Sequence, residues 1–190
     1  MGSPSYLDPH KILQSLRTLN ERVSVPLWLF GGVAVDFLVG RWTRPHGDID
    51  LNTYSETRDV LATELQRIGY ATSDQGWLTH WGNERTGERL EIVFLERTEH
   101  GEAELRIPPG AQVGVPGRYP LLPGYLDPGR RATLGGVTFR VCSPAGEWLG
   151  RKRGVVAGRV AEPKIAHDLQ LLETLIPPDE LAKLEASMQS

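Results

Sequence analysis

Residues 29–51 of the chain read LFGGVAVDFLVGRWTRPHGDIDL, and this stretch decides the fold. It begins at the end of an apolar run, passes through the glycine pair Gly31-Gly32, and closes with Asp48 and Asp50 on either side of one isoleucine. Residues two apart on a strand point to the same face, so both carboxylates face the same way. Two like charges side by side are unfavourable unless a positive group lies between them. The spacing therefore predicts a bound cation at Asp48 and Asp50.

The glycine pair predicts a phosphate site close to the aspartates. Gly31 and Gly32 have no side chains, so a nucleotide phosphate can approach their backbone amides closely. The helix expected over residues 33–39 would direct its positive end at the same phosphates. Mg²⁺ prefers carboxylate and phosphate oxygens, so a phosphate cradle opposite a metal clamp is equipment for phosphoryl transfer. Taken alone, each motif has an ordinary alternative, a turn glycine pair or a solvent-facing strand end.

The bulk properties describe a water-soluble globular chain. Its 190 residues are enough for one domain, or for one domain with a small appendage. The formal net charge of −3 indicates no basic face for nucleic acid. Cys142 is the single cysteine, which excludes an internal disulfide and a cysteine-based zinc site. The chain shows no apolar run of membrane-spanning length and no signal pattern at its start, so a cytoplasmic protein without a membrane partner is expected.

Helical and strand patterns alternate in the first part of the chain and helices dominate its end, which predicts an α/β (α+β) fold. The nucleotide-binding unit is expected over residues 1–142 and a small helical C-terminal portion over residues 143–190. Residues 101–136 are rich in proline and glycine and are expected to form an irregular loop with short strands. The patterns predict helices over residues 10–23, 33–39, 55–68, 163–175 and from 143 onward, and strands over residues 25–30, 48–52, 70–81, 89–95 and 137–141.

The glycine pair followed by Asp48-x-Asp50 resembles the signature of the nucleotidyltransferase superfamily that includes DNA polymerase beta. The longer string is more specific. Residues 34–36 (Ala-Val-Asp) and 43–50 (Thr-Arg-Pro-His-Gly-Asp-Ile-Asp) resemble the aminoglycoside 2″-adenylyltransferase-like and lincosamide nucleotidyltransferase families. The resemblance is strong over residues 27–52, extends to about residue 97 and is thin thereafter. It implies a polymerase-beta-like fold with a mixed sheet.

The superfamily resemblance implies a third carboxylate on a later strand. Glu91 in the string RLEIVFLE is the first candidate, because it follows Leu90 on an apolar strand where a charged residue is otherwise poorly placed. Many superfamily members carry aspartate here, so Glu91 departs from the pattern by one methylene. Glu96, where the same strand ends, is the competing candidate.

Further residues are candidates for nucleotide binding. Arg44 and His46 lie in the loop before the aspartates and are expected to contact phosphates or to order the loop, with a surface ion pair as the alternative for Arg44. Asp36 is expected to orient this loop. The string KIAHDLQLLE resembles the helix that brings a lysine to the triphosphate, which makes Lys164 the candidate. A solvated helix face is the alternative reading of Lys164.

The resemblance implies a Mg²⁺-dependent transfer of a nucleoside monophosphate, AMP in the first instance, from ATP or another nucleoside triphosphate to a hydroxyl group of a small molecule. Asp48, Asp50 and Glu91 would hold two metal ions, and Glu91 would take the proton of the acceptor. An aminoglycoside or lincosamide acceptor implies a role in antibiotic resistance. A tRNA or protein acceptor and a non-catalytic nucleotide-binding module are the alternatives. The acceptor is expected to depend on residues 97–140, and the oligomeric state stays open.

Overall fold

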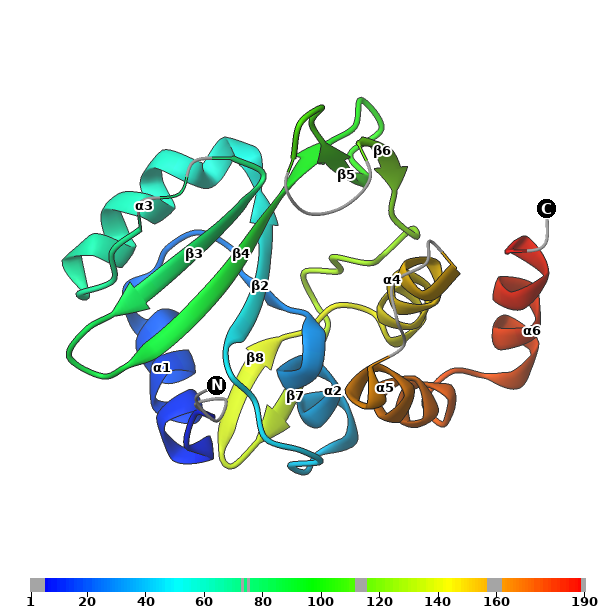
Figure 1. The fold of residues 1–190 in the computed structure, drawn as a ribbon, viewed down its shortest axis with the longest axis horizontal. Helices are drawn as coiled ribbons and strands as arrows, with labels where there is room; N and C mark the ends of the chain where they lie inside the picture. Colours follow the sequence, from blue (N-terminus) through cyan, green and yellow to red (C-terminus); the bar gives the residue numbers. More distant parts are fainter. Residues whose placement is uncertain (1–5, 73, 75, 112–115, 157–161, 189–190) are drawn as a thin grey trace.

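The chain forms a mixed sheet and a group of C-terminal helices, with one helix between them. The computed structural model describes residues 6–72, 74, 76–111, 116–156 and 162–188. Helix α2 (Gly31–Val39) lies between strand β2 of the sheet and helix α5 (Figure 1). The C-terminal group consists of α4 (Pro144–Val156), α5 (Pro163–Glu173) and α6 (Pro178–Ser187). None of the helices in the described ranges has both the length and the apolar character needed to cross a membrane.

The main sheet is mixed, as the sequence predicts. Its central pair, β2 (Ile49–Tyr54) and β4 (Glu88–Arg97), runs parallel, with Asp50 opposite Glu91. The other pairs are antiparallel. The order along the sheet is β1 (Trp28–Leu29), β2, β4, β5 (Ala103–Ile107) and β6 (Gly117–Pro120), and β3 (Leu78–Asn83) also pairs with β4.

The two faces of the sheet carry different side chains because strand residues alternate between faces. On β4, Leu90, Ile92 and Phe94 belong to the main hydrophobic core, which includes side chains of α1 (Pro9–Arg22) and α3 (Arg58–Arg67). Val93 and Leu95 belong to a second cluster on the opposite face. Glu91 shares the parity of Val93, and this alternation explains how an acidic residue is accommodated on an otherwise apolar strand.

The remaining elements close the core. Strands β7 (Arg131–Leu134) and β8 (Val137–Arg140) form a hairpin, and their turn glycines, Gly135 and Gly136, both have positive φ. This conformation suits a two-residue hairpin turn. A third cluster joins Val35 of α2 to Trp148 of α4 and to apolar side chains of α5 and α6. Helix α2 is therefore packed on both sides, which fixes the position of its N-terminus.

Several boundaries differ from the sequence predictions. Helix α2 begins at Gly31 rather than Val33, so the glycine pair forms its first turn. The strand expected over residues 25–30 is shorter and consists of β1 alone. The strand expected over residues 70–81 corresponds to β3, which begins and ends later in the chain. A 3-10 turn, η1 (Ser55–Thr57), precedes α3, so the α-helix expected from residue 55 begins only at Arg58, and the Ser55 hydroxyl donates to Glu96. These differences leave the order of the elements unchanged.

Candidate active site

Three carboxylates meet at one edge of the parallel strand pair. Oxygen atoms of Asp48, Asp50 and Glu91 all lie within 4.8 Å of one another. Asp48 precedes β2 and is exposed, whereas Asp50 and Glu91 are half-buried partners on β2 and β4. Glu96 lies further along β4, where its carboxylate accepts a hydrogen bond from Ser55 at 3.1 Å. The geometry favours Glu91 over Glu96 as the third acidic residue of the cluster.

The pKa values of two of these carboxylates are raised by their surroundings. Burial raises the pKa of Asp50 well above its usual value, and the charges of Asp48, Glu91 and Glu147 add to the effect. Burial also raises the pKa of Glu91, with a further contribution from Asp48, although His80 and Lys164 oppose it. Carboxylates that repel one another at this distance suit a hard divalent cation. The donor set therefore fits Mg²⁺.

The glycine pair is required by close packing at this cluster. Gly31 has φ +71°, in the left-handed region, and a Cβ atom there would overlap the carboxylate of Asp50. A Cβ atom on Gly32 would overlap the guanidinium of Arg44. Any other residue at Gly31 would push Asp50 aside, and any other residue at Gly32 would push Arg44 aside, so glycine lets the first turn of α2 lie against both side chains. Phosphate binding by their amides stays a prediction.

Glu147 on α4 connects the C-terminal helices to the first turn of α2. Its buried carboxylate accepts hydrogen bonds from the Gly31 amide at 2.9 Å, the Tyr125 hydroxyl at 2.8 Å and Arg151 Nη1 at 2.6 Å. Asn52 on β2 in turn donates to the Tyr125 hydroxyl at 3.1 Å. The sequence patterns assigned Glu147 no role in the site. Its spacing of four residues from Arg151, beside the apolar Trp148, was the one available signal of a buried ion pair.

Asp168 on α5 holds the loop that precedes the acidic cluster. It accepts two hydrogen bonds from Arg44, from Nε at 3.0 Å and from Nη2 at 2.9 Å, and Arg151 Nη2 lies 3.4 Å away. Burial raises the pKa of Asp168, but the hydrogen bond from Arg44 and the two positive charges outweigh it and lower the pKa below its usual value. Arg44 is thus engaged in a largely buried ion pair. Its contact with a phosphate stays a prediction.

The same loop is ordered by a buried pair behind it. His46 Nε2 lies 2.6 Å from Asp36 Oδ2, and both side chains are buried. Asp36 Oδ1 accepts hydrogen bonds from the Thr43 amide at 3.0 Å and from its hydroxyl at 2.5 Å. Asp36 therefore orients the loop, as expected from the sequence. These contacts give His46 a loop-ordering role, and nucleotide binding by His46 stays a prediction.

Lys164 lies near the start of α5 and is turned to solvent. Its ammonium forms an ion pair with Glu162 at 2.9 Å, and its side chain is 57% exposed. Its charge lowers the pKa of Glu91, as the weakest of several influences, which places it within electrostatic reach of the acidic cluster. The structure brings Lys164 to the same side of the molecule as the cluster without a direct contact to it.

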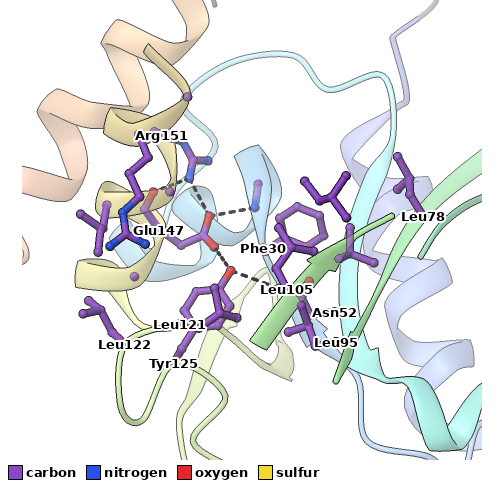
Figure 2. A pocket seen from close by; sticks show the side chains of 18 of the residues that line it. Phe30, Asn52, Leu78, Leu95, Leu105, Leu121, Leu122, Tyr125, Glu147 and Arg151 are labelled. Atoms are coloured by element: carbon purple, nitrogen blue, oxygen red, sulfur yellow. Dashed lines mark hydrogen bonds and ion pairs between the residues drawn. The ribbon is translucent and has the colours of Figure 1, made fainter. Parts of the chain in front are cut away.

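A cavity of about 380 Å³ lies beside the acidic cluster. Gly31 and Glu91 both line it, so it reaches the glycine pair and the third carboxylate. Figure 2 shows Glu147 and Arg151 of α4 facing a group of apolar side chains that includes Phe30 and Leu105. A reactant in this cavity would lie next to the carboxylate cluster.

Comparisons of the sequence with known proteins find related chains. The family described as aminoglycoside-2″-adenylyltransferase matches residues 10–147. A 2″-aminoglycoside nucleotidyltransferase of Klebsiella pneumoniae is 40% identical over 76 residues, a match that covers 38% of this chain and 42% of that relative, less than half of its length.

Solved structures share the fold. The structure of ANT(2″)-Ia in complex with adenylyl-2″-tobramycin has a TM-score of 0.72 at 20% identity, over 94% of this chain and 95% of that one. The lincomycin-bound lincosamide antibiotic adenylyltransferase LnuA has a TM-score of 0.67 at 19% identity, over 90% of this chain and all (100%) of that one.

Proposed function

This chain belongs to the aminoglycoside-2″-adenylyltransferase family, and from that membership we propose that it is a Mg²⁺-dependent enzyme that transfers AMP from ATP to a hydroxyl group of a small-molecule antibiotic. The observation that carries the proposal is the cluster of Asp48, Asp50 and Glu91 beside the N-terminus of α2. Aminoglycosides and lincosamides are the acceptor classes that the relatives' names suggest. Antibiotic resistance in the cytoplasm, where ATP is available, is the proposed biological role.

The position of each acidic residue suggests its role in the proposed reaction. Asp48 and Asp50 would hold the metal, together with oxygens of the triphosphate, and Glu91 would complete the site. Bound Mg²⁺ supplies positive charge that stabilises the triphosphate in the transition state and makes the acceptor hydroxyl more acidic. Glu91 would take the hydroxyl proton, because its carboxylate belongs to the acidic cluster and lines the neighbouring cavity. The acceptor oxygen forms a bond to the α-phosphorus, the bond from that phosphorus to the bridging oxygen breaks, and pyrophosphate leaves.

The nucleotide would be held by the first turn of α2 and by basic groups around it. We propose that the amide of Gly32 and the side chains of Arg44 and Lys164 face the phosphates, with His46 ordering the loop. The Gly31 amide already donates to Glu147, so Gly31 would contribute only by having no side chain, which lets the turn lie close to the phosphates. Residues 143–190 would act as a separate helical portion that brings Lys164 to the triphosphate. The acceptor would occupy the neighbouring cavity, next to Glu91.

Pyrophosphate release tests the proposal directly. The protein would be incubated with Mg²⁺, each common ribonucleoside triphosphate, and a panel of aminoglycosides and lincosamides. We expect ATP-dependent turnover that falls by about 10²–10⁴-fold in Glu91→Gln, because general-base catalysis contributes about that factor. Glu96→Gln removes a carboxylate from the same strand outside the cluster and should keep full activity.

Two results would contradict the proposal. One is the absence of Mg²⁺-dependent nucleotide binding in the wild-type protein by calorimetry. The other is an equal loss of activity in Glu91→Gln and Glu96→Gln, because the cluster would then have no special role.

A further inference from the structure

The apolar character and the charge of the cavity wall beside Glu91 indicate which class of acceptor fits. Resting on the function proposed above, we infer that the preferred acceptor is a hydroxyl compound with an apolar body and at most one positive charge. Polyamine aminoglycosides are therefore poor substrates of this chain, despite its family.

Most of the cavity wall is hydrocarbon. Apart from Gly31 and Glu91 at the catalytic end, the surface consists mainly of leucine, isoleucine, valine and aromatic side chains. Several of them are only half-buried, which leaves apolar area available to a ligand. These half-buried side chains are Phe30, Trp77, Leu78, Leu105, Leu121, Leu122 and Ile165.

The acidic group on the α4 side of the cavity is already neutralised. Glu147 accepts from the Gly31 amide, the Tyr125 hydroxyl and Arg151, so its carboxylate is occupied by three donors. Arg151 also faces Asp168 at 3.4 Å. Recruiting Glu147 to bind an ammonium group would break this buried network and leave Arg151 without one of its carboxylate partners.

No carboxylate in the described lining of the cavity is left for a cationic ligand, apart from Glu91, which belongs to the acidic cluster. Arg153 adds a further positive charge to the wall. An aminoglycoside carries several ammonium groups, and each would lose its hydration against hydrocarbon without a counter-charge. An apolar body instead gains free energy in proportion to the apolar area that it buries. The charge balance and the wall chemistry point to the same class of acceptor.

The wild-type protein tests the inference without any variant. Binding of lincomycin, an amphipathic hydroxyl compound, and of tobramycin, a polyamine, would be measured by calorimetry with Mg²⁺ and a non-reactive ATP analogue. We expect lincomycin to bind at least about 10-fold more tightly than tobramycin. This factor is the lower end of the discrimination that a single apolar group provides in a hydrophobic pocket. The affinity for lincomycin should change less than about 2-fold between low and high salt, because apolar contacts are not screened.

A matched pair of variants tests the wall itself. Leu105→Glu on β5 places a carboxylate at the cavity, whereas Leu105→Met keeps an apolar side chain of similar volume. Leu105→Glu should weaken lincomycin binding by about 10-fold or more and raise the tobramycin-to-lincomycin affinity ratio. Leu105→Met should stay within about 3-fold of wild type, and nucleotide binding should be unchanged in both.

Several outcomes would overturn the inference. They are tobramycin binding equal to or tighter than lincomycin binding, a strongly salt-dependent lincomycin affinity, binding of neither compound, and equal effects of the two Leu105 variants. All of them leave the proposed function standing if Mg²⁺-dependent nucleotide binding is retained. Loss of nucleotide binding by the wild-type protein would contradict the proposed function instead, so the two failures are distinguishable.

Discussion

Asp168→Asn is the substitution for which the structure gives the clearest magnitude. The side chain is 3% exposed and its carboxylate faces two guanidinium groups, those of Arg44 and Arg151. The isosteric amide keeps one acceptor oxygen but removes the charge. Breaking a fully buried ion pair costs about 3–5 kcal/mol because the partner is left uncompensated. Arg44 and Arg151 are 20% and 14% exposed, so water recovers part of this cost. We expect a loss of about 2–3 kcal/mol in the free energy of unfolding.

Urea unfolding followed by tryptophan fluorescence measures this loss. For a chain of this size the expected change corresponds to a drop of about 4–12 °C in Tm. Asp179→Asn is the matched control, because Asp179 pairs with Lys183 at 4.0 Å and its side chain is 78% exposed. It should cost at most about 1 kcal/mol, from a weak ion pair and a favourable place in the first turn of α6. If the two variants are equally stable, the Arg44–Asp168–Arg151 network does not stabilise the fold and the reasoning is refuted.

Three other predictions follow from the same contacts. The pKa of folded Asp168 is lowered, so its contribution is present above the usual aspartate pKa of 3.8 and is lost as the pH falls through the lower, folded value; the stability difference between wild type and Asp168→Asn should vanish over that range in urea titrations, and a constant difference would contradict it. Gly31→Ala should abolish pyrophosphate release because its Cβ atom overlaps Asp50, whereas Gly40→Ala, also at positive φ (+75°) but with open space around it, should lose about 1 kcal/mol of stability and keep its activity. Cys142 is fully buried and burial raises its thiol pKa, so it should resist alkylation in native protein and react only in urea; modification at the same rate in both would show that its surroundings open.

The Asp48–Asp50 pair could be predicted from local rules, whereas a third carboxylate was expected because the superfamily resemblance implies one. Asp48 and Asp50 are separated by the period of a strand, and Glu91 interrupts an apolar run whose alternation places it on the other face from Leu90. Parallel pairing of β2 with β4 then puts Asp50 opposite Glu91. The α/β class was predictable because strand and helix patterns alternate along the first part of the chain, whereas the mixed sheet was expected from the family resemblance.

The contacts that hold the cluster in place were not accessible in this way. Glu147 meets Gly31 across 116 residues and Asp168 meets Arg44 across 124. No periodicity links positions so far apart. The sequence therefore left two interpretations of Arg44 open, a phosphate contact and an ion pair. The cavity wall could not be predicted either. Leu105, Leu121 and Leu122 line it, and they come from the segment in which the helical and strand patterns were weakest.

The C-terminal helices hold both the first turn of α2 and the loop before Asp48 in place, although no residue of these helices belongs to the acidic cluster. Glu147 on α4 binds the amide of Gly31, and Asp168 on α5 binds Arg44, just before the aspartates. Arg151 contacts both carboxylates, so the two attachments share one guanidinium group. A change at Arg151 would therefore loosen the glycine turn and the aspartate loop together. Because Arg151 joins both attachments, we expect a substitution there to lower stability and activity together.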